Sequence, residues 1–150
     1  MLIYIDTSVI NGLYAQDTDI KRDTVYFFEN VRKFGYTLYA SEATIDEIEQ
    51  TPQKSKEALL KNVIKEHKVD ILPITEEARR LANRYIDAKI IPNKYFADAL
   101  HIAVASVHKV PVLASWNFEH MVKVKTKLAV IAINRQHGYP IVEISSPKEV

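Results

Sequence analysis

Three acids and one amide occupy positions from which their side chains could act together on a phosphate. Asp6 directly follows the apolar run "LIYI", Glu47 lies in "TIDEI", Asp98 lies in "ADALHIAVA", and Asn117 follows "VLASW". Hydrolysis of a phosphodiester needs an activated water, compensation for charge on the phosphate oxygens, and help for the leaving alkoxide. Hard divalent cations held by oxygen ligands supply all three, and carboxylates are the matching ligands.

Asp98 is the most conspicuous of these residues because its neighbours in the same segment are core-like Ala, Leu, Ile and Val. An acid near a core needs a cation or a hydrogen-bond donor as a partner. Three converging carboxylates would also repel one another, which raises at least one pKa until a cation enters. The cluster therefore predicts a requirement for a divalent cation.

The elements that must position these residues alternate between strands and helices. Strands are predicted over 2–5, 36–40, 69–74, 111–115 and 140–144. Helices are predicted over 6–14, 19–34, 42–51, 52–67 and 75–88, then from after Asn93 to 110, with a last helix ending near His137. This alternation indicates an α/β fold, a three-layer αβα sandwich with a central parallel β-sheet. Ligands of such sheets bind beyond the carboxyl ends of the strands, which is where Asp6 lies.

Length and composition limit the possibilities further. The 150 residues are 47% hydrophobic and contain no repeat or linker, so we expect one domain over 1–150. There is no cysteine, which excludes disulfides and thiolate metal sites. A net charge of +1 means that any nucleic-acid binding must be local. Apolar runs too short to span a bilayer and the absence of a signal-peptide pattern predict a soluble, cytoplasmic protein without a membrane partner.

Four segments of the chain resemble the signature segments of PIN domains, particularly those of VapC-type toxins from toxin–antitoxin pairs. They are "YIDTSVI", "TIDEI", "ADALHIAVA" and "LASWNFEHM". The resemblance covers nearly the whole chain, down to "ISSPKEV" at its end. Each segment alone is a weak pattern, but their order and spacing on the predicted α/β framework make the combination specific.

The resemblance implies a fold, an activity and partners. PIN domains use acids at these segments to bind Mg²⁺ or Mn²⁺ and to hydrolyse RNA, so the expected protein is an endoribonuclease and the toxin of a type II pair. Asp6, Glu47 and Asp98 match the first three acids of the family, and Ser8 and Ser115 match hydroxyl positions beside the metal site. The family commonly forms homodimers and is silenced by a small antitoxin that places a basic side chain near the acids.

Asn117 is the main departure from the family pattern, since a fourth acid, usually Asp, is common at this position. The amide removes one negative charge from the place where a second cation would be held. Its side-chain carbonyl can still ligate a metal or a water. We expect Asp6 and Asp98 to be direct ligands, and Glu47 to ligate the metal or orient a water. Weakened activity remains an open alternative.

Each of these residues also has a purely structural explanation. Asp6 and Ser8 are favoured helix N-caps, and Glu47 lies in a run of acids typical of a solvated face. Asp98 could accept a backbone hydrogen bond near a helix start, and Asn117 suits a turn after a strand. Only the joint placement of the residues favours a catalytic site.

The histidines and aromatic residues receive structural interpretations. His101 and His108 do not have the spacing of a zinc helix motif, and His108 is interpreted as a helix C-terminal cap. His120 is interpreted as a surface residue, and Trp116 and Phe118 as residues that close a core.

Two groups of basic residues are interpreted as solvated faces, with a local phosphate track as the alternative reading. The first contains Arg79, Arg80, Arg84, Lys89 and Lys94. The second is "KVKTK", with Lys123, Lys125 and Lys127.

Two other classes of function stay open. The first is a catalytically weakened PIN module that binds RNA or protein, which Asn117 motivates. The second is an aspartate-nucleophile phosphatase, because a strand-end Asp followed by Thr also occurs there. That class requires a second Asp where this chain has Ser8, and no glycine-rich phosphate loop is present.

Overall fold

The structure is a computed structural model that describes all 150 residues, and its centre is a five-stranded parallel sheet. The strands are β1 (Leu2–Ile5), β2 (Thr37–Ser41), β3 (Asp70–Leu72), β4 (Val112–Ala114) and β5 (Glu143–Ser145), in the order β3-β2-β1-β4-β5. Ile3 of the central strand pairs with Leu38 on one side and Val112 on the other.

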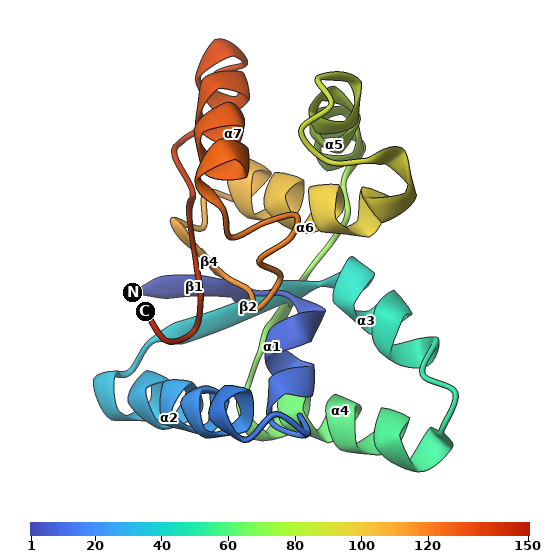
Figure 1. The fold of residues 1–150 in the computed structure, drawn as a ribbon, viewed down its shortest axis with the longest axis vertical. Helices are drawn as coiled ribbons and strands as arrows, with labels where there is room; N and C mark the ends of the chain where they lie inside the picture. The colour runs from blue at the N-terminus through green and yellow to red at the C-terminus, as the bar shows by residue number, and fades with distance from the viewer.

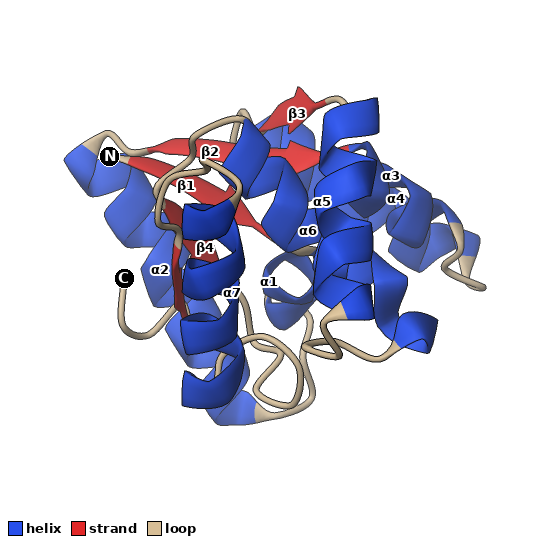
Figure 2. Cartoon of the chain, turned by 90° about the horizontal axis from the view of Figure 1, so that it is seen from above, coloured by secondary structure: helices blue, strands red, loops and turns tan.

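Helices cover both faces of this sheet (Figures 1 and 2). They are α1 (Thr7–Gly12), α2 (Thr18–Phe34), α3 (Glu42–Glu49), α4 (Lys54–Glu66), α5 (Glu76–Asp87), α6 (Phe96–Val107) and α7 (Val124–Gln136). In Figure 1, α2 and α4 lie on one face of the sheet, and α5, α6 and α7 lie on the other. The predicted αβα sandwich with a parallel sheet is confirmed. No helix combines the length and apolar character that crossing a membrane requires.

Two apolar cores fill the spaces between the layers, and the central strand contributes to both. Ile3 and Ile5 belong to the core shared with α1, α2 and α4, whereas Tyr4 belongs to the core shared with α5, α6 and α7. All three side chains are completely buried. Since alternate residues of a strand face opposite sides, burial on both faces explains why β1 is apolar throughout.

Most element boundaries differ from the sequence prediction by one to three residues. The last strand was predicted over 140–144 but begins at Glu143, which pairs with Val112. Pro140 lies before it and uses its carbonyl oxygen to accept a hydrogen bond from Asn134 Nδ2 at 3.2 Å. The helix predicted to start after Asn93 begins at Phe96, after a 3₁₀ turn at Asn93–Tyr95, and ends at Val107.

Three helices end with a lysine in the left-handed conformation where glycine is normally found. Lys68, Lys89 and Lys109 have φ values of 53°, 59° and 58° and follow α4, α5 and α6. After α6, Lys109 N–H donates to Ser106 O at 3.2 Å and Val110 N–H donates to Ala105 O at 2.9 Å. This hydrogen-bond pair defines a Schellman motif, which satisfies helix carbonyls. A lysine there lies near the negative end of the helix dipole, which offsets part of the backbone strain.

We expect Lys109→Gly to raise the free energy of unfolding by about 0.5–1 kcal/mol, because glycine adopts this φ without the Cβ clash that costs about 1–2 kcal/mol. Urea unfolding monitored by circular dichroism would measure the change. Lys109→Ala is the matched control, since it removes the charge but keeps the Cβ. A gain in the alanine variant as large as in the glycine variant would contradict backbone strain as the cause.

Candidate active site

A small polar cavity lies at the carboxyl ends of the central strands. Its volume is about 280 Å³, and none of its eight lining residues is hydrophobic. The lining residues are Asp6, Thr7, Ser8, Asn11, Glu47, Asp98, His101 and Asn117. The structure therefore brings the four candidate residues around one space: Asp6 directly after β1, Glu47 on α3, Asp98 on α6 and Asn117 in the loop after β4.

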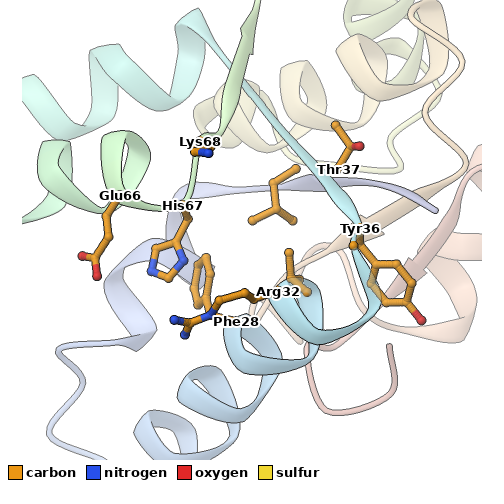
Figure 3. A pocket seen from close by; sticks show the side chains of 10 residues that line it. Phe28, Arg32, Tyr36, Thr37, Glu66, His67 and Lys68 are labelled. Atoms are coloured by element: carbon orange, nitrogen blue, oxygen red, sulfur yellow. The ribbon is translucent and has the colours of Figure 1, made fainter.

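A larger cavity of about 510 Å³ lies elsewhere, where β2 begins (Figure 3). Its lining includes Phe28, whose ring centroid lies 4.4 Å from that of His67, with Arg32 beside them. Burial lowers the pKa of His67 there. None of the predicted site residues lines this cavity, and Glu66 is its only carboxylate. The candidate chemistry therefore belongs to the smaller cavity.

Asp6 combines the capping and the cavity-lining roles that the sequence left as alternatives. Its Oδ1 accepts the Val9 N–H at 3.3 Å as the N-cap of α1 and also accepts the Ser8 hydroxyl at 2.5 Å. Its Oδ2 accepts the Ser115 hydroxyl at 2.5 Å. Burial raises the pKa of Asp6, and the charge of His101 and the two hydroxyl bonds offset only part of that rise.

Ser8 and Ser115 also fix the loop that follows β4. The Ser8 Oγ accepts the Trp116 N–H at 2.8 Å, and the Ser115 Oγ accepts the Asn117 N–H at 2.9 Å. Each hydroxyl thus donates to Asp6 and accepts from the backbone of this loop. The position of Asn117 is consequently tied to the position of Asp6.

Glu47 ends a chain of hydrogen bonds that starts at Ser41, the last residue of β2. Tyr4 Oη donates to Ser41 Oγ at 2.8 Å and lies 2.6 Å from His101 Nδ1. His101 Nε2 lies 2.5 Å from Glu47 Oε1, which also accepts the Thr7 hydroxyl at 3.0 Å. Because Tyr4 uses its proton on Ser41, its oxygen is an acceptor toward His101. Both ring nitrogens of His101 then donate, which makes the ring an imidazolium.

The protonation preferences of this pair agree with that assignment. Burial alone lowers the pKa of His101, but Tyr4, the bond and charge of Glu47, and the charge of Asp6 together raise it well above its ordinary value. Burial raises the pKa of Glu47, whereas the bond and charge of His101 and the bond from Thr7 lower it to a net value below the ordinary one. Glu47 is thus an ionised acid.

Asp98 lies in the first turn of α6 and is the least compensated acid. Burial raises its pKa; the charge of His101 lowers it in part, and the charges of Asp6 and Glu47 raise it further. Its Oδ2 accepts the Asn117 Nδ2–H at 3.1 Å. The Asn117 carbonyl oxygen accepts the His120 N–H at 2.9 Å, so the amide presents its nitrogen to Asp98.

Two histidine interpretations need correction, and a third is confirmed. His120 was placed on the surface, but its side chain is only 12% exposed and its ring packs against Tyr95 at a centroid distance of 4.0 Å. His101 is buried, as a structural residue would be, yet it also lines the cavity and bonds to Glu47. The sequence did contain a signal for this position of His101, because residues three apart on a helix share a face and His101 lies three residues after Asp98. His108 does end α6, with Nδ1 3.0 Å from Val104 O.

The aromatic residues that flank Asn117 differ from each other. Trp116 packs against the core of α1, α2 and α4 and donates its Nε1–H to Thr24 Oγ1 at 2.9 Å. Phe118 is 53% exposed, so the prediction that it closes a core is wrong.

The residues present fit a hard divalent cation in the kind of ligand they offer. Carboxylate oxygens from Asp6, Glu47 and Asp98 line one cavity, and the raised pKa of Asp98 reflects the charges of the other two acids. No group of three or more histidine or acidic side chains is arranged to hold a metal ion as it stands. Binding would therefore require at least one carboxylate to turn toward the others.

Comparisons with known proteins show which family and which solved structures this chain is similar to. Residues 3–120 match the family profile described as the PIN domain. The comparison with curated proteins finds no match. The fold is similar to that of Mycobacterium tuberculosis VapC20, described as a toxin that cleaves the sarcin-ricin loop. That comparison has a TM-score of 0.60 and 11% identity, and it covers 79% of this chain and 92% of VapC20.

Two further solved structures resemble almost the entire chain. VapBC2 from Rickettsia felis, bound to a DNA fragment from its promoter, gives a TM-score of 0.62 at 13% identity over 97% of this chain and 98% of the other. VapBC-1 from nontypeable Haemophilus influenzae gives 0.62 at 14% identity over 98% of both chains. At these identities the likeness establishes the fold alone.

The raised pKa of His101 predicts how stability depends on pH. A group whose folded pKa exceeds its unfolded value stabilises fully below the unfolded pKa, and that stability is lost as pH rises through the folded pKa. The Tm should therefore fall as pH increases above about 6.5, the ordinary histidine value. Thermal unfolding across this range would test it, with His101→Gln as the comparison because glutamine keeps a polar group without titrating. Parallel profiles for the two proteins would refute an imidazolium at His101.

Proposed function

Because the chain belongs to the PIN domain family, we propose that it is a divalent-metal-dependent endoribonuclease and the toxin of a type II toxin–antitoxin pair. PIN and VapC proteins are nucleases, and PIN nucleases generally use divalent metals. The observation that carries the proposal is the convergence of Asp6, Glu47, Asp98 and Asn117 on one polar cavity at the carboxyl ends of the strands. The proposed nuclease is a single PIN-like domain over residues 1–150.

The three acids would hold Mg²⁺ or Mn²⁺, which when bound supplies charge compensation for the phosphate and a water of lowered pKa. Asp6 is locked by Ser8 and Ser115, so it would act as a fixed ligand. Glu47 is oriented by His101 through one oxygen, which leaves Oε2 to face a ligand or a water. Asp98 is held by one amide bond only and is the acid that can turn most readily.

The proposed partners follow from the same site. RNA is the substrate, and a small antitoxin would silence the enzyme by bringing a basic side chain to the acids. VapB and VapC are present together in two of the similar structures, which supports an antitoxin partner. The proposed protein is a homodimer. Its proposed location is the cytoplasm, because both RNA and the antitoxin are encountered in that compartment.

A second candidate function is a weakened PIN module that binds RNA or a protein without cutting. The orientation of Asn117 favours it, because the amide nitrogen faces Asp98 and the carbonyl oxygen is already occupied by the His120 N–H. In this orientation the side chain adds a hydrogen-bond donor where the family commonly has an acid.

Asp98→Asn should abolish cleavage of a pool of structured RNAs while raising the Tm of the metal-free protein. Loss of a ligand removes several kcal/mol of transition-state stabilisation, which corresponds to at least about a 100-fold drop in rate. The Tm rises because a desolvated, repelled charge is replaced by a neutral side chain. Activity would be measured with Mn²⁺, Mg²⁺ or chelator, and Tm by calorimetry.

Asn117→Asp separates the two candidate functions in the same assay. A wild type that cleaves, with more activity in Asn117→Asp, supports the nuclease and shows the effect of the missing acid. If the wild type does not cleave RNA but Asn117→Asp does, the result supports the binding module. Cleavage that persists in Asp98→Asn would point to a contaminating nuclease and remove the support for this site.

Mg²⁺ or Mn²⁺ should raise the Tm of the wild type. At a ligand concentration of about 100 times Kd, a ligand that binds only the native state stabilises it by about 2.7 kcal/mol. For a chain of this length, that corresponds to a rise in Tm of about 5–10 °C. Asp6→Asn should reduce the shift, whereas Asp46→Asn, on the same helix as Glu47 but outside the cavity, should not. The absence of any shift in the wild type would count against a metal site.

A further inference from the structure

A second polar cavity lies beside the acids, between the end of α5 and the start of α7. Its volume is about 340 Å³, and its polar lining consists of Lys89, Lys123, Lys125, Thr126, His120 and Glu119. None of these residues lines the cavity of the acids. His120 nevertheless connects the two, because its backbone N–H donates to the Asn117 amide that bonds Asp98.

The lining contains the chain's only two buried side-chain polar atoms without a hydrogen-bond partner. They are Thr126 Oγ1 and His120 Nε2. Thr126 is only 1% exposed. A buried polar group without a partner destabilises the free protein, and native structures contain few of them. A ligand in this cavity would complete their hydrogen bonds.

The start of α7 adds backbone N–H groups to the same region, since Lys125 and Thr126 line the cavity. The N–H groups of Val124, Lys125 and Thr126 donate to no acceptor within the chain. Lys123 occupies the N-cap position and makes no side-chain capping bond, and the first turn contains no acid. Uncapped N–H groups at the positive end of a helix dipole attract an anion.

The charges around the cavity favour the same kind of ligand. Lys89, Lys123 and Lys125 form no ion pair. Glu119 is the one acid, and its side chain is 80% exposed with an oxygen 3.7 Å from His120 Nε2. Its exposure leaves it free to turn into solvent, so the local field is positive although the net charge of the whole chain is only +1.

We propose that this cavity is a phosphate subsite that binds a backbone phosphate of the RNA strand next to the bond cut at the acids. The proposal rests on the proposed nuclease function. Thr126, His120 and the free N–H groups of α7 would donate hydrogen bonds to the phosphate, and the three lysines would supply charge. The loop that carries Asn117 and His120 contributes to both cavities, and in this proposal one strand contacts both.

The experiment measures binding of a single-stranded RNA oligonucleotide to an Asp98→Asn background, where the strand is not cut. Thr126→Val, which removes one hydroxyl and keeps the shape, should lower the affinity about tenfold, as expected for a hydrogen bond to a charged group. Lys125→Ala should make the slope of log affinity against log salt shallower by about 0.7, the value for one phosphate contact. Lys21→Ala on α2 is the control and should change neither.

Thermal unfolding without RNA gives a readout that is independent of cleavage. Thr126→Val should raise the Tm of the free protein, because it removes an unsatisfied buried group. Thr24→Val is the matched control and should lower the Tm, since Thr24 Oγ1 is bonded to both Ile20 O and Trp116 Nε1. Inorganic phosphate should raise the Tm of the wild type more than that of Thr126→Val.

RNA affinity and salt slope that are unchanged in Thr126→Val and Lys125→Ala would overturn the subsite, even if inorganic phosphate raises the Tm. That outcome would leave the nuclease proposal intact, since cleavage by the wild type and its loss in Asp98→Asn are measured separately. A failure of the nuclease proposal appears instead as no metal-dependent cleavage, whatever the binding results.

Discussion

Repulsion among the carboxylates is the constraint around which this end of the molecule is built. Asp6, Glu47 and Asp98 share one cavity, and the chain directs donors at each of them. Asp6 receives two hydroxyls and a helix N–H, and Glu47 receives a hydroxyl and an imidazolium. Asp98 receives a single amide. The compensation is uneven, because the pKa of Glu47 is lowered while those of Asp6 and Asp98 stay raised.

Asn117 alters this balance in two opposite ways. An acid at its position would add a fourth charge to a cavity that already contains three, whereas its amide nitrogen donates to Asp98. We therefore expect the free protein to be more stable with Asn than with Asp at this position. A cation, however, gains less from an amide donor than from a carboxylate ligand. In the proposed metal site, the same residue would thus favour the stability of the free protein over affinity for metal, a common compromise at functional sites.

Sequence patterns predicted the architecture and the placement of the three acids at one edge of the sheet, because both depend on local regularities. Burial of β1 on both faces produces its apolar run, and a parallel sheet places its carboxyl ends together. The roles of His101 and His120 depend instead on partners far away in the chain. His101 contacts Tyr4 and Glu47, which are 97 and 54 residues from it, and no local pattern encodes those contacts. The orientation of the Asn117 amide likewise depends on the folded loop.

The loop after β4 contributes to both polar cavities, and the two cavities have opposite imbalances of charge and hydrogen bonding. On one side, Ser115 and Asn117 face acids that retain too much negative charge for their surroundings. On the other side, His120 faces lysines, a free helix start and an unpartnered hydroxyl, where donors are in excess. In the free protein the donors of one cavity do not bond to the acids of the other, because they line separate cavities. In the proposed nuclease, a cation at the acids and a phosphate at the lysines would relieve both imbalances, and an RNA strand bound at the metal would supply the phosphate.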